Sequence, residues 1–407
     1  MNVLFMSLID IQTVSSYSLY PDLLRRFIAH GDRVYIISPF ERRNSERERV
    51  IEEVNARIVK VKIWNMQKTN GIEKLFSMIT IDKIFIKAIQ KYFGDVRFDL
   101  ILYPTPPITF GNAVEYVKNR DGAKTYLLLK DIFPQNAVDL GMMTKNGIKG
   151  VLYKYFRCQE KKLYAISDRI GCMSPANVEY ILQHNPEIDP RKVEVCPNSI
   201  EIIDKSVDDE VRKAIRNKYN IPLDKKVFVY GGNLGRPQGI DFLIRCLKKC
   251  ENSDAFFLIV GDGTEYRLLE NYVINSRQKN VKLMPRIPKE DYDNMVGACD
   301  VGMIFLDHRF TIPNFPSRIL SYMQAKLPVL AVTDKNTDIG KIITVNGFGW
   351  WCESENEETF VNLIKYIIID GDFSCKANQS FEFLKYNYCS ERAYRIISEW
   401  GNNLKMI

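Results

Sequence analysis

The chain has 407 residues, of which 46% are hydrophobic and 26% are charged, with only 22 glycines and 17 prolines. This length exceeds one ordinary hydrophobic core, and the composition excludes disordered, collagen-like and low-complexity proteins. The formal charge of +7 arises in the first 200 residues, which hold 29 Lys and Arg against 22 Asp and Glu. That excess suits phosphate or anionic lipid, but it is too small, without a recognition module, to favour nucleic acid.

The nine cysteines indicate a reduced protein of the cytoplasm. They are odd in number, include no C-x-x-C pair and lie mostly in apolar runs, so neither a disulfide framework nor a zinc site is expected. The apolar start, residues 1–14, lacks a basic region and a cleavage site, which favours a core strand over a signal peptide. No uninterrupted apolar stretch reaches about 18 residues, so we expect no membrane-spanning helix.

Short apolar runs alternate with amphipathic segments along the first half of the chain. Such near-continuous apolar strands, separated by helices, are typical of a parallel sheet that is covered on both faces. We therefore predict an N-terminal Rossmann-like domain over residues 1–200. Its strands are predicted at 2–8, 33–38, 99–104, 124–129, 169–174 and 192–197.

The same alternation repeats after a polar, charged stretch at 202–225. It predicts a second Rossmann-like domain over 201–385, followed by a helical segment, 386–407, that could cross back to the first domain. The predicted fold class is thus α/β, with two doubly wound parallel sheets facing across a cleft. The strands of the second domain are predicted at 226–232, 255–263, 280–285, 300–305 and 328–334.

Three motifs follow strands of the second domain, where open α/β sheets bind their ligands. "VYGGNLGRPQG" (229–239) is a glycine turn before a helix, which suits phosphate but also occurs for packing alone. "VGDG" (260–263) is either a ligand loop or a plain turn between strand and helix. "MPRIP" (284–288) puts Arg286 and Ile287 where they could meet the edge of a nucleobase.

The fourth motif, "IPNFPSRILSYMQAKLPVLA" (312–331), follows the next predicted strand. Its prolines fix a turn, and Ser317 is expected to cap a helix over 318–326. Arg318 then adds a positive charge at the positive end of the helix dipole, which is unfavourable unless an anion binds there. The alternative is an arginine that reaches solvent or pairs with an acid.

Together these segments resemble the GT-B glycosyltransferases, specifically the retaining family 4 type that builds bacterial capsule, O-antigen and exopolysaccharide. The segments that carry the resemblance in the second half are "GGNLGRPQG", "VGDG", "CDVGMIFL" and "PNFPSRILSYMQAKLPVLA", the last being similar to the family's PSK-I-x-EYM-A-x-G-KPV element. In the first half they are "YSLYPDLLRRFIAHGDRVYIISP", "KDIFPQ", "MSPANVEYI" and "CPNSIE". The resemblance covers nearly the whole chain.

The resemblance implies an enzyme, a glycosyltransferase of the hexosyltransferase type. Its donor would be a nucleotide diphosphate sugar, UDP-linked, held by the second domain. Its acceptor would be a glycan or a polyprenyl-diphosphate-linked precursor that approaches the first domain at the inner face of the plasma membrane. No metal or other cofactor is expected, because arginines can neutralise the diphosphate and the leaving phosphate can accept the proton of the attacking hydroxyl.

The resemblance also implies the site residues. Asp131 would reach the donor sugar or the acceptor hydroxyl, while Arg236 and Arg318 would stabilise the leaving diphosphate. His308 is a candidate because it follows a predicted strand. It either contacts the substrate or packs within its loop. The expected substrate contacts are Gly232, Asn233, Gln238, Gly261, Arg286, Ile287, His308, Asn314, Phe315, Pro316, Ser317 and Ser321.

The chain departs from the family pattern at four positions. Pro313 and Ser321 stand where the family has glutamates, and Asn233 and Gln238 stand where it has an arginine and a lysine. Arginines elsewhere in the motifs are the expected replacements, because guanidinium pairs bidentately with phosphate. The departures leave two alternatives open: a non-catalytic nucleotide-sugar-binding partner of a polysaccharide assembly complex, and a UDP-sugar epimerase on the same architecture.

Two segments of the first half combine basic and apolar side chains. Segment 79–93 predicts an amphipathic helix with Lys83, Lys87 and Lys91 on its polar side, and segment 145–168 mixes basic and aromatic residues. Such surfaces suit peripheral contact with an anionic membrane. The alternative is a pair of ordinary sheet-covering helices with solvated lysines.

Overall fold

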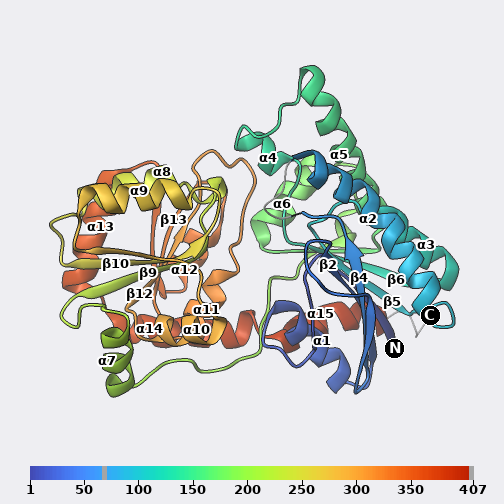
Figure 1. Ribbon diagram of the computed structural model, residues 1–407, viewed down its shortest axis with the longest axis horizontal. Coiled ribbons are helices and arrows are strands. Elements are labelled where there is room, and N and C mark those ends of the chain that lie inside the picture. Colours follow the sequence, from blue (N-terminus) through green and yellow to red (C-terminus); the bar gives the residue numbers. More distant parts are fainter. Residues whose placement is uncertain (67–70, 403–407) are drawn as a thin grey trace. The chain divides into compact units, whose positions relative to one another are not determined.

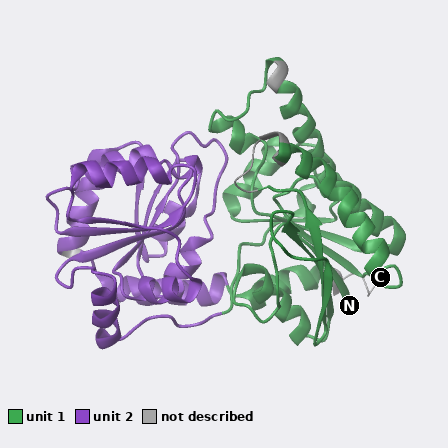
Figure 2. Cartoon of the chain, viewed as in Figure 1, with its two compact units in different colours: residues 1–201, 389–407 green, residues 202–388 purple. Residues whose placement is uncertain are grey.

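The computed structural model describes residues 1–66 and 71–402, and the chain divides into two compact units (Figure 2). Unit 1 combines Met1–Glu201 with the C-terminal segment that begins at Cys389, and unit 2 is Ile202–Tyr388. The sequence analysis placed the two boundaries after residues 200 and 385. Unit 2 is therefore inserted into unit 1 rather than appended to it.

Unit 1 is built on one eight-stranded sheet with the order β3-β4-β2-β1-β5-β6-β7-β8 (Figure 1). All neighbours in it are parallel except the edge strand β3, which pairs with β4 in the antiparallel sense. The predicted parallel sheet is confirmed, but the β3-β4 hairpin was not predicted. The strands are β1 (Asn2–Met6), β2 (Arg33–Glu41), β3 (Arg49–Glu53), β4 (Ala56–Ile63), β5 (Leu100–Pro104), β6 (Lys124–Leu129), β7 (Arg169–Cys172) and β8 (Val193–Val195).

Helices cover both faces of this sheet, with α1 and α15 on one face and α2, α3 and α5 on the other (Figure 1). On α2, Ile81, Phe85 and Ile89 are buried while the three predicted lysines are exposed, so the amphipathic helix is confirmed. The helices are α1 (Leu19–Ala29), α2 (Gly71–Tyr92), α3 (Gly111–Asp121), α4 (Gln135–Asp139), α5 (Gly147–Ile166), α6 (Pro175–His184) and α15 (Ser390–Asn402), with a short 3-10 turn at Pro190–Lys192.

The last helix, α15, belongs to the core of unit 1. Its Ala393 and Ile397 share one hydrophobic cluster with Phe27 of α1, and the Tyr394 ring packs edge-on against Phe27 with centroids 4.9 Å apart. The Ser390 amide donates to the Ile200 carbonyl over 2.9 Å, which ties the start of α15 to the end of the first segment. The C-terminal segment thus closes unit 1.

Unit 2 contains a six-stranded, fully parallel sheet with the order β11-β10-β9-β12-β13-β14. The strands are β9 (Lys226–Asn233), β10 (Ala255–Asp262), β11 (Val281–Met284), β12 (Val301–Phe305), β13 (Val329–Thr333) and β14 (Gly349–Glu353). The helices are α7 (Asp209–Lys218), α8 (Ile240–Lys249), α9 (Tyr266–Ser276), α10 (Lys289–Gly297), α11 (Arg318–Gln324), α12 (Ile339–Val345), α13 (Glu357–Asp370) and α14 (Phe373–Asn387), with a 3-10 turn at Arg236–Gln238.

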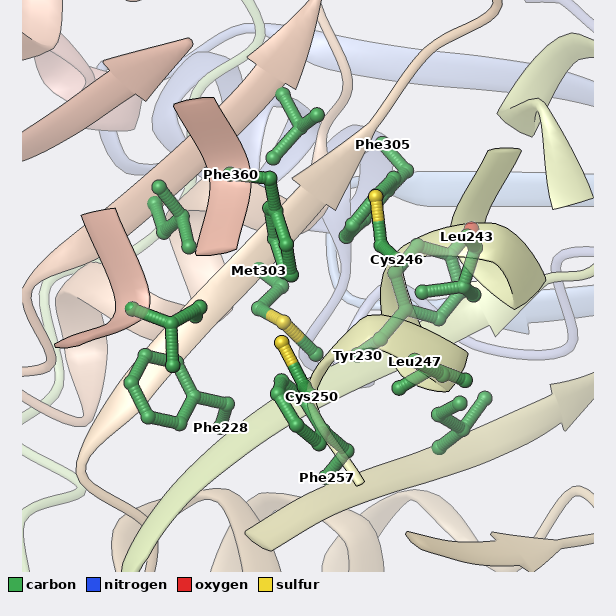
Figure 3. Packing of buried hydrophobic residues seen from close by; sticks show 14 of the residues in the cluster. Phe228, Tyr230, Leu243, Cys246, Leu247, Cys250, Phe257, Met303, Phe305 and Phe360 are labelled. Atoms are coloured by element: carbon green, nitrogen blue, oxygen red, sulfur yellow. The ribbon is translucent and has the colours of Figure 1, made fainter. Parts of the chain in front are cut away.

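The core of unit 2 lies between the sheet and helices α8 and α13 (Figure 3). Phe257, Phe305 and Phe360 pack there around the buried thiols Cys246 and Cys250. All nine cysteines are free, as expected, and burial raises the pKa of the Cys250 thiol to about 12. The six buried cysteines therefore act as small apolar residues.

Among the described residues, no helix is both long enough and apolar enough to cross a bilayer.

Candidate functional site

Strand β9 ends in two glycines that play different roles. A Cβ on Gly231 would lie 1.6 Å from the Tyr292 hydroxyl oxygen, so this glycine makes room for a tyrosine of the same unit. Gly232 is exposed and has a φ of +124°, and a Cβ there would lie 3.5 Å from the Arg318 guanidinium carbon. The structure thus brings Gly232 and Arg318 together at the carboxyl edge of the sheet.

Arg318 is half-buried, and its guanidinium lacks a complete set of partners. Its guanidinium lies over the Tyr230 ring, 4.3 Å from the centroid, and its Nη1 is buried with no hydrogen-bond partner among the described residues. Burial tends to lower the pKa of this guanidinium, but Tyr230 and Tyr322 raise it, and the pKa lies above its usual value. A charged donor that is left unpaired away from water is costly, and a bound anion would remove that cost.

Two tyrosines that the sequence analysis did not identify make hydrogen bonds to the backbone around Arg318. The Tyr322 hydroxyl donates to the Met303 carbonyl over 3.0 Å and accepts from the Gly231 amide over 3.2 Å. The Tyr230 hydroxyl donates to the Asn233 carbonyl over 2.7 Å. Burial raises the pKa of Tyr322 to about 12, so it is neutral at physiological pH.

Asn233 and Gln238, which replace the family's arginine and lysine, bind each other. The Asn233 side-chain amide donates to the Gln238 Oε1 over 2.9 Å, and the Gly235 backbone amide donates to the same oxygen over 3.1 Å. These bonds shape the turn after β9 but supply no positive charge. Arg318 therefore carries the charge at this end of β9.

Arg236 and His308 line a separate pocket, whose described lining does not include Arg318. The Arg236 side chain is 58% exposed, and its Nε lies 3.7 Å from a Glu265 carboxylate oxygen. His308 Nε2 lies 3.5 Å from a Glu355 oxygen. The expectation that Arg236 shares one anion site with Arg318 gains no support from this placement.

The loop that holds Asn314 is anchored by a buried acid that the sequence analysis did not single out. The Asn314 amide donates to the Thr337 hydroxyl over 3.0 Å, and that hydroxyl donates to the Asp334 carboxylate over 2.9 Å. Burial raises the pKa of Asp334 to about 6, against the opposing effect of its hydrogen bonds with Thr337 and Asn336. The Asn314 Nδ2 is buried without a hydrogen-bond partner among the described residues, so this loop also offers an unused donor.

The predicted helix cap at Ser317 is wrong. Ser317 does precede α11, but its backbone is helical, with φ −64° and ψ −18°, and its hydroxyl makes no capping hydrogen bond. A capping side chain usually needs extended backbone in order to reach back to the free amides. The helix is also shorter than predicted and ends at Gln324.

The other predicted contacts of this loop differ in their exposure. Ser317 is exposed, whereas Pro316 and Ser321 are half-buried. Phe315 is buried, and its ring packs against Tyr388 with centroids 5.8 Å apart. Phe315 thus supports the loop through packing.

The remaining predicted contacts of unit 2 follow the neighbouring strands. A Cβ on Gly261 would lie 1.9 Å from the Gly232 carbonyl oxygen, so β10 runs unusually close to the end of β9. Arg286 is exposed and Ile287 is half-buried, and both follow the edge strand β11. Strand β10 separates β11 from β9, so these two residues lie on the far side of β10 from Gly232.

In unit 1, Asp131 follows β6 in a polar setting of its own. The Asn136 side-chain amide lies 2.8 Å from each carboxylate oxygen, and the Asp131 amide donates to the Thr105 hydroxyl over 3.2 Å. Burial raises the pKa of Asp131 to about 6, although the hydrogen bonds from Ile132 and Asn136 oppose the rise. The carboxylate is thus fixed in place and titrates close to neutrality.

Metal-ligating side chains do not cluster in the part of the chain that the structure describes, where no group of three or more His, Cys, Asp or Glu could hold an ion. The expectation of a metal-independent reaction remains a prediction.

Residues 211–382, which lie within unit 2, match the family model described as "Glycosyl transferases group 1". This stretch is a group 1 glycosyltransferase domain. The group 1 domain contains all the predicted contacts from Gly232 to Ser321, including Arg318. The predicted glycosyltransferase class of enzyme is therefore confirmed at the level of this domain, whereas family 4 membership remains a prediction.

Two relatives are similar to this chain over most of its length. The chain is 27% identical to "Probable glycosyltransferase WbjE" of Pseudomonas aeruginosa over 329 residues, which cover 80% of this chain and 78% of the relative. It is 22% identical to "Putative colanic acid biosynthesis glycosyl transferase WcaI" of Escherichia coli K12 over 276 residues, covering 67% and 66% of the two chains. The similarity therefore extends beyond the group 1 domain.

Solved structures match the entire fold. Sucrose-phosphate synthase from Thermosynechococcus elongatus superposes with a TM-score of 0.77 at 14% identity, covering 100% of this chain and 99% of the other. Anabaena HepE in complex with UDP-glucose gives 0.69 at 14% identity with complete coverage of both chains, and the lipopolysaccharide glycosyltransferase WaaG gives 0.64 at 14% identity with 97% and 99% coverage. At these identities the likeness concerns the fold, and it confirms the predicted GT-B architecture.

Proposed function

We propose that the protein is a retaining glycosyltransferase that moves a sugar from a UDP-sugar to a glycan or a polyprenyl-diphosphate-linked acceptor in surface polysaccharide biosynthesis. The observation that carries the proposal is the Arg318 guanidinium beside Gly232, at the carboxyl edge of a group 1 domain, whose Nη1 is buried with no hydrogen-bond partner among the described residues. The printed names of WbjE and WcaI support the sugar transfer and the polysaccharide role. The UDP and UDP-glucose complexes of HepE support the choice of nucleotide.

In this proposal Arg318 binds the diphosphate. The missing Cβ of Gly232 lets a phosphate approach the backbone, and the buried Nη1 donates to a phosphate oxygen. The raised pKa keeps the guanidinium charged, so it stabilises the negative charge that develops as the bond between sugar and diphosphate breaks. The charge is fixed in position by Tyr230, so little reorganisation accompanies the step.

Bond formation needs no strong protein base. The acceptor oxygen attacks the anomeric carbon on the face that the diphosphate leaves, and its proton passes to the leaving phosphate oxygen. Asp131, with a pKa of about 6, is mostly ionised at pH 7 and accepts a hydrogen bond that orients the acceptor hydroxyl. We assign the donor to unit 2 and the acceptor to unit 1, without a metal.

The membrane part of the proposal rests on α2. Its exposed lysines at 83, 87 and 91 follow one another at intervals of four residues, over a buried apolar side that packs on β4. A row of this kind attracts anionic lipid at about 1 kcal/mol per lysine near the surface. We propose peripheral association with the inner face of the plasma membrane, where a lipid-linked acceptor is available.

A thermal-shift screen against UDP, GDP, ADP, TDP and CMP tests the donor site. We expect one nucleoside diphosphate to raise the melting temperature of the wild type, because a ligand that binds only the folded state stabilises it. Arg318→Ala should lose this shift, whereas Arg267→Ala, a change at an exposed arginine of α9, should keep it. A wild type that no nucleotide stabilises would refute the donor site.

A second candidate is a non-catalytic nucleotide-sugar-binding partner of a polysaccharide assembly complex. It is favoured by the two positions, Pro313 and Ser321, that lack the family's glutamates, and by Asn233 and Gln238, which bind each other. Nucleotide binding without any release of UDP from UDP-sugars, in the presence of lipid-linked acceptors, would select this candidate. Isomerisation of the UDP-sugar without an acceptor would instead indicate the epimerase.

A further inference from the structure

Unit 2 holds a pocket of about 410 Å³ that no part of the proposed function uses. It lies on the α8 side of the sheet, at the carboxyl ends of the strands. Its walls come from the start of α8, from the loop after β12 and from Ser354, which follows β14. The volume falls in the range of about 300–1,000 Å³ that is usual for small-molecule sites.

The charged side chains that line this pocket balance one another. The lining includes three arginines, Arg236, Arg245 and Arg309, and three acids, Asp241, Glu265 and Asp307. Arg309 binds both oxygens of Asp307, over 2.8 and 2.7 Å. Burial raises the pKa of Asp307, but the bonds from Arg309 outweigh it and hold that pKa below its usual value. The pocket therefore presents strong donors and strong acceptors with no net charge.

Ser354 gives the second, independent observation. The residue is 1% exposed, and its Oγ is buried without a hydrogen-bond partner among the described residues. Its backbone amide donates to the Thr333 carbonyl over 2.9 Å, which fixes the residue at the end of the sheet. Leaving a buried hydroxyl unpaired is costly, and a bound hydroxyl group in the pocket would remove that cost.

We propose that this pocket binds a neutral sugar residue of a glycan, at a subsite separate from the Arg318 site. A sugar hydroxyl both donates and accepts, so it can satisfy arginines, carboxylates and the Ser354 hydroxyl together. An anion would meet three carboxylates there, and an apolar ligand would leave the polar walls unpaired. Since the described lining includes neither Arg318 nor Gly232, Arg236 and His308 belong to this subsite instead of the donor site.

Saturation-transfer NMR tests the subsite in the presence of saturating UDP. The probes are D-glucose, D-galactose, N-acetyl-D-glucosamine and L-rhamnose, each titrated separately, with inorganic phosphate as the competing anion. We expect saturable transfer to at least one sugar, unaffected by UDP, by phosphate and by Arg318→Ala. Ser354→Ala should weaken this binding about fivefold, as for one lost hydrogen bond.

Ser374→Ala, at an exposed position of α14, is the matched control and should bind sugar as the wild type does. Asp241→Asn, at an exposed lining residue in the first turn of α8, gives a second variant that should weaken binding even if Ser354→Ala does not fold. Sugar binding that persists in a protein that UDP does not stabilise would support the subsite and refute only the donor site.

Three outcomes would overturn the proposal. The first is the absence of saturable transfer to all four sugars. The second is a sugar signal that UDP or Arg318→Ala abolishes, because the sugar then occupies the donor site. The third is phosphate binding that displaces the sugar and depends on Ser354, which would make the pocket an anion site.

Discussion

Two arginines of unit 2, the buried Arg216 and the half-buried Arg318, lie in contrasting environments. Arg216 is 3% exposed, and all three guanidinium nitrogens have partners: Nη2 donates to Asp300 over 2.7 Å, Nε to the Ala298 carbonyl over 2.8 Å and Nη1 to two carbonyls of the 222–225 turn. The Arg318 guanidinium lies over the Tyr230 ring, and its Nη1 has no hydrogen-bond partner among the described residues. Arg216 is thus fully bonded inside the protein, whereas Arg318 keeps the unused donor that the proposed diphosphate site requires.

Arg216→Ala should have the largest effect on the fold. The change leaves the Asp300 carboxylate buried beside the Val227 amide with one of its charged partners gone, and breaking such pairs costs about 3–5 kcal/mol. Urea unfolding should show this loss. The nucleotide-induced shift should persist in whatever fraction folds, and a loss below about 1 kcal/mol would remove the contrast between the two arginines.

Arg318→Met should have the opposite effects, a small change in stability and a large loss of activity. The free energy of unfolding should change by less than about 1.5 kcal/mol, because an apolar side chain of similar length replaces an unsatisfied buried charge. The rate of transfer should fall by about 10²–10³, the usual loss for one group that stabilises a leaving charge. Steady-state kinetics with UDP-sugar and matched unfolding curves measure both effects. A large loss of stability with intact kinetics would make Arg318 structural.

The comparison extends to an acid, Asp131. Its carboxylate accepts hydrogen bonds from the neutral side-chain amide of Asn136, where Asp300 accepts them from a charged arginine. Burial raises the pKa of Asp131 to about 6, above the unfolded value near 3.8, so the ionised form is the one that folding disfavours. Transfer that needs this carboxylate ionised should rise with pH through a midpoint near 6, while Asp131→Asn should be slow and lack that step. A pH–rate profile of both proteins checks this.

The same shift in the pKa of Asp131 predicts the sign of a stability effect. Between about pH 4 and 6 the folded state binds more protons at this site than the unfolded chain, so its contribution to stability falls as pH rises. Asp131→Asn should flatten that part of the stability curve. A wild type and a variant that change in parallel over this range would contradict the raised pKa.

Gly232→Ala should have the smallest effect. Its φ of +124° is a backbone conformation that side chains other than glycine rarely adopt, so the change should cost about 1–3 kcal/mol of stability. The new methyl group would lie against the Arg318 guanidinium, which should raise the KM for the donor more than it lowers kcat. Normal KM values in a folded variant would exclude a phosphate from this turn.

Much of the fold followed from local patterns in the sequence. Strands such as β9, β10, β12 and β13 are continuous apolar runs bounded by glycine or acidic residues, which is what a sheet buried on both faces demands. The β3-β4 hairpin was not predicted, because β4 alternates apolar and basic residues and the sequence suggests that its Lys60 is exposed to solvent. In the fold Lys60 is fully buried and pairs with Asp10, a partner that only the folded sheet supplies.

The candidate site was predictable only in part, for the same reason. Arg318 stood out because its charge conflicts with the local dipole, a rule that needs no tertiary structure. Tyr230 and Tyr322 did not stand out in the sequence. The order of strands β9, β12 and β13 in the folded sheet brings them around the Arg318 guanidinium. The role predicted for Arg236 stays a prediction, because nearness in sequence does not fix on which side of a strand end a side chain lies.

The way the chain returns to unit 1 has a consequence for its synthesis. Residues 202–388 complete unit 2, whereas the core of unit 1 needs Ala393 and Ile397 of α15. On the ribosome, unit 2 has all its residues before unit 1 does, although it is encoded later. Until the last helix emerges, the Phe27 side of α1 therefore stays uncovered, and exposed apolar surface of this kind favours aggregation of the nascent chain.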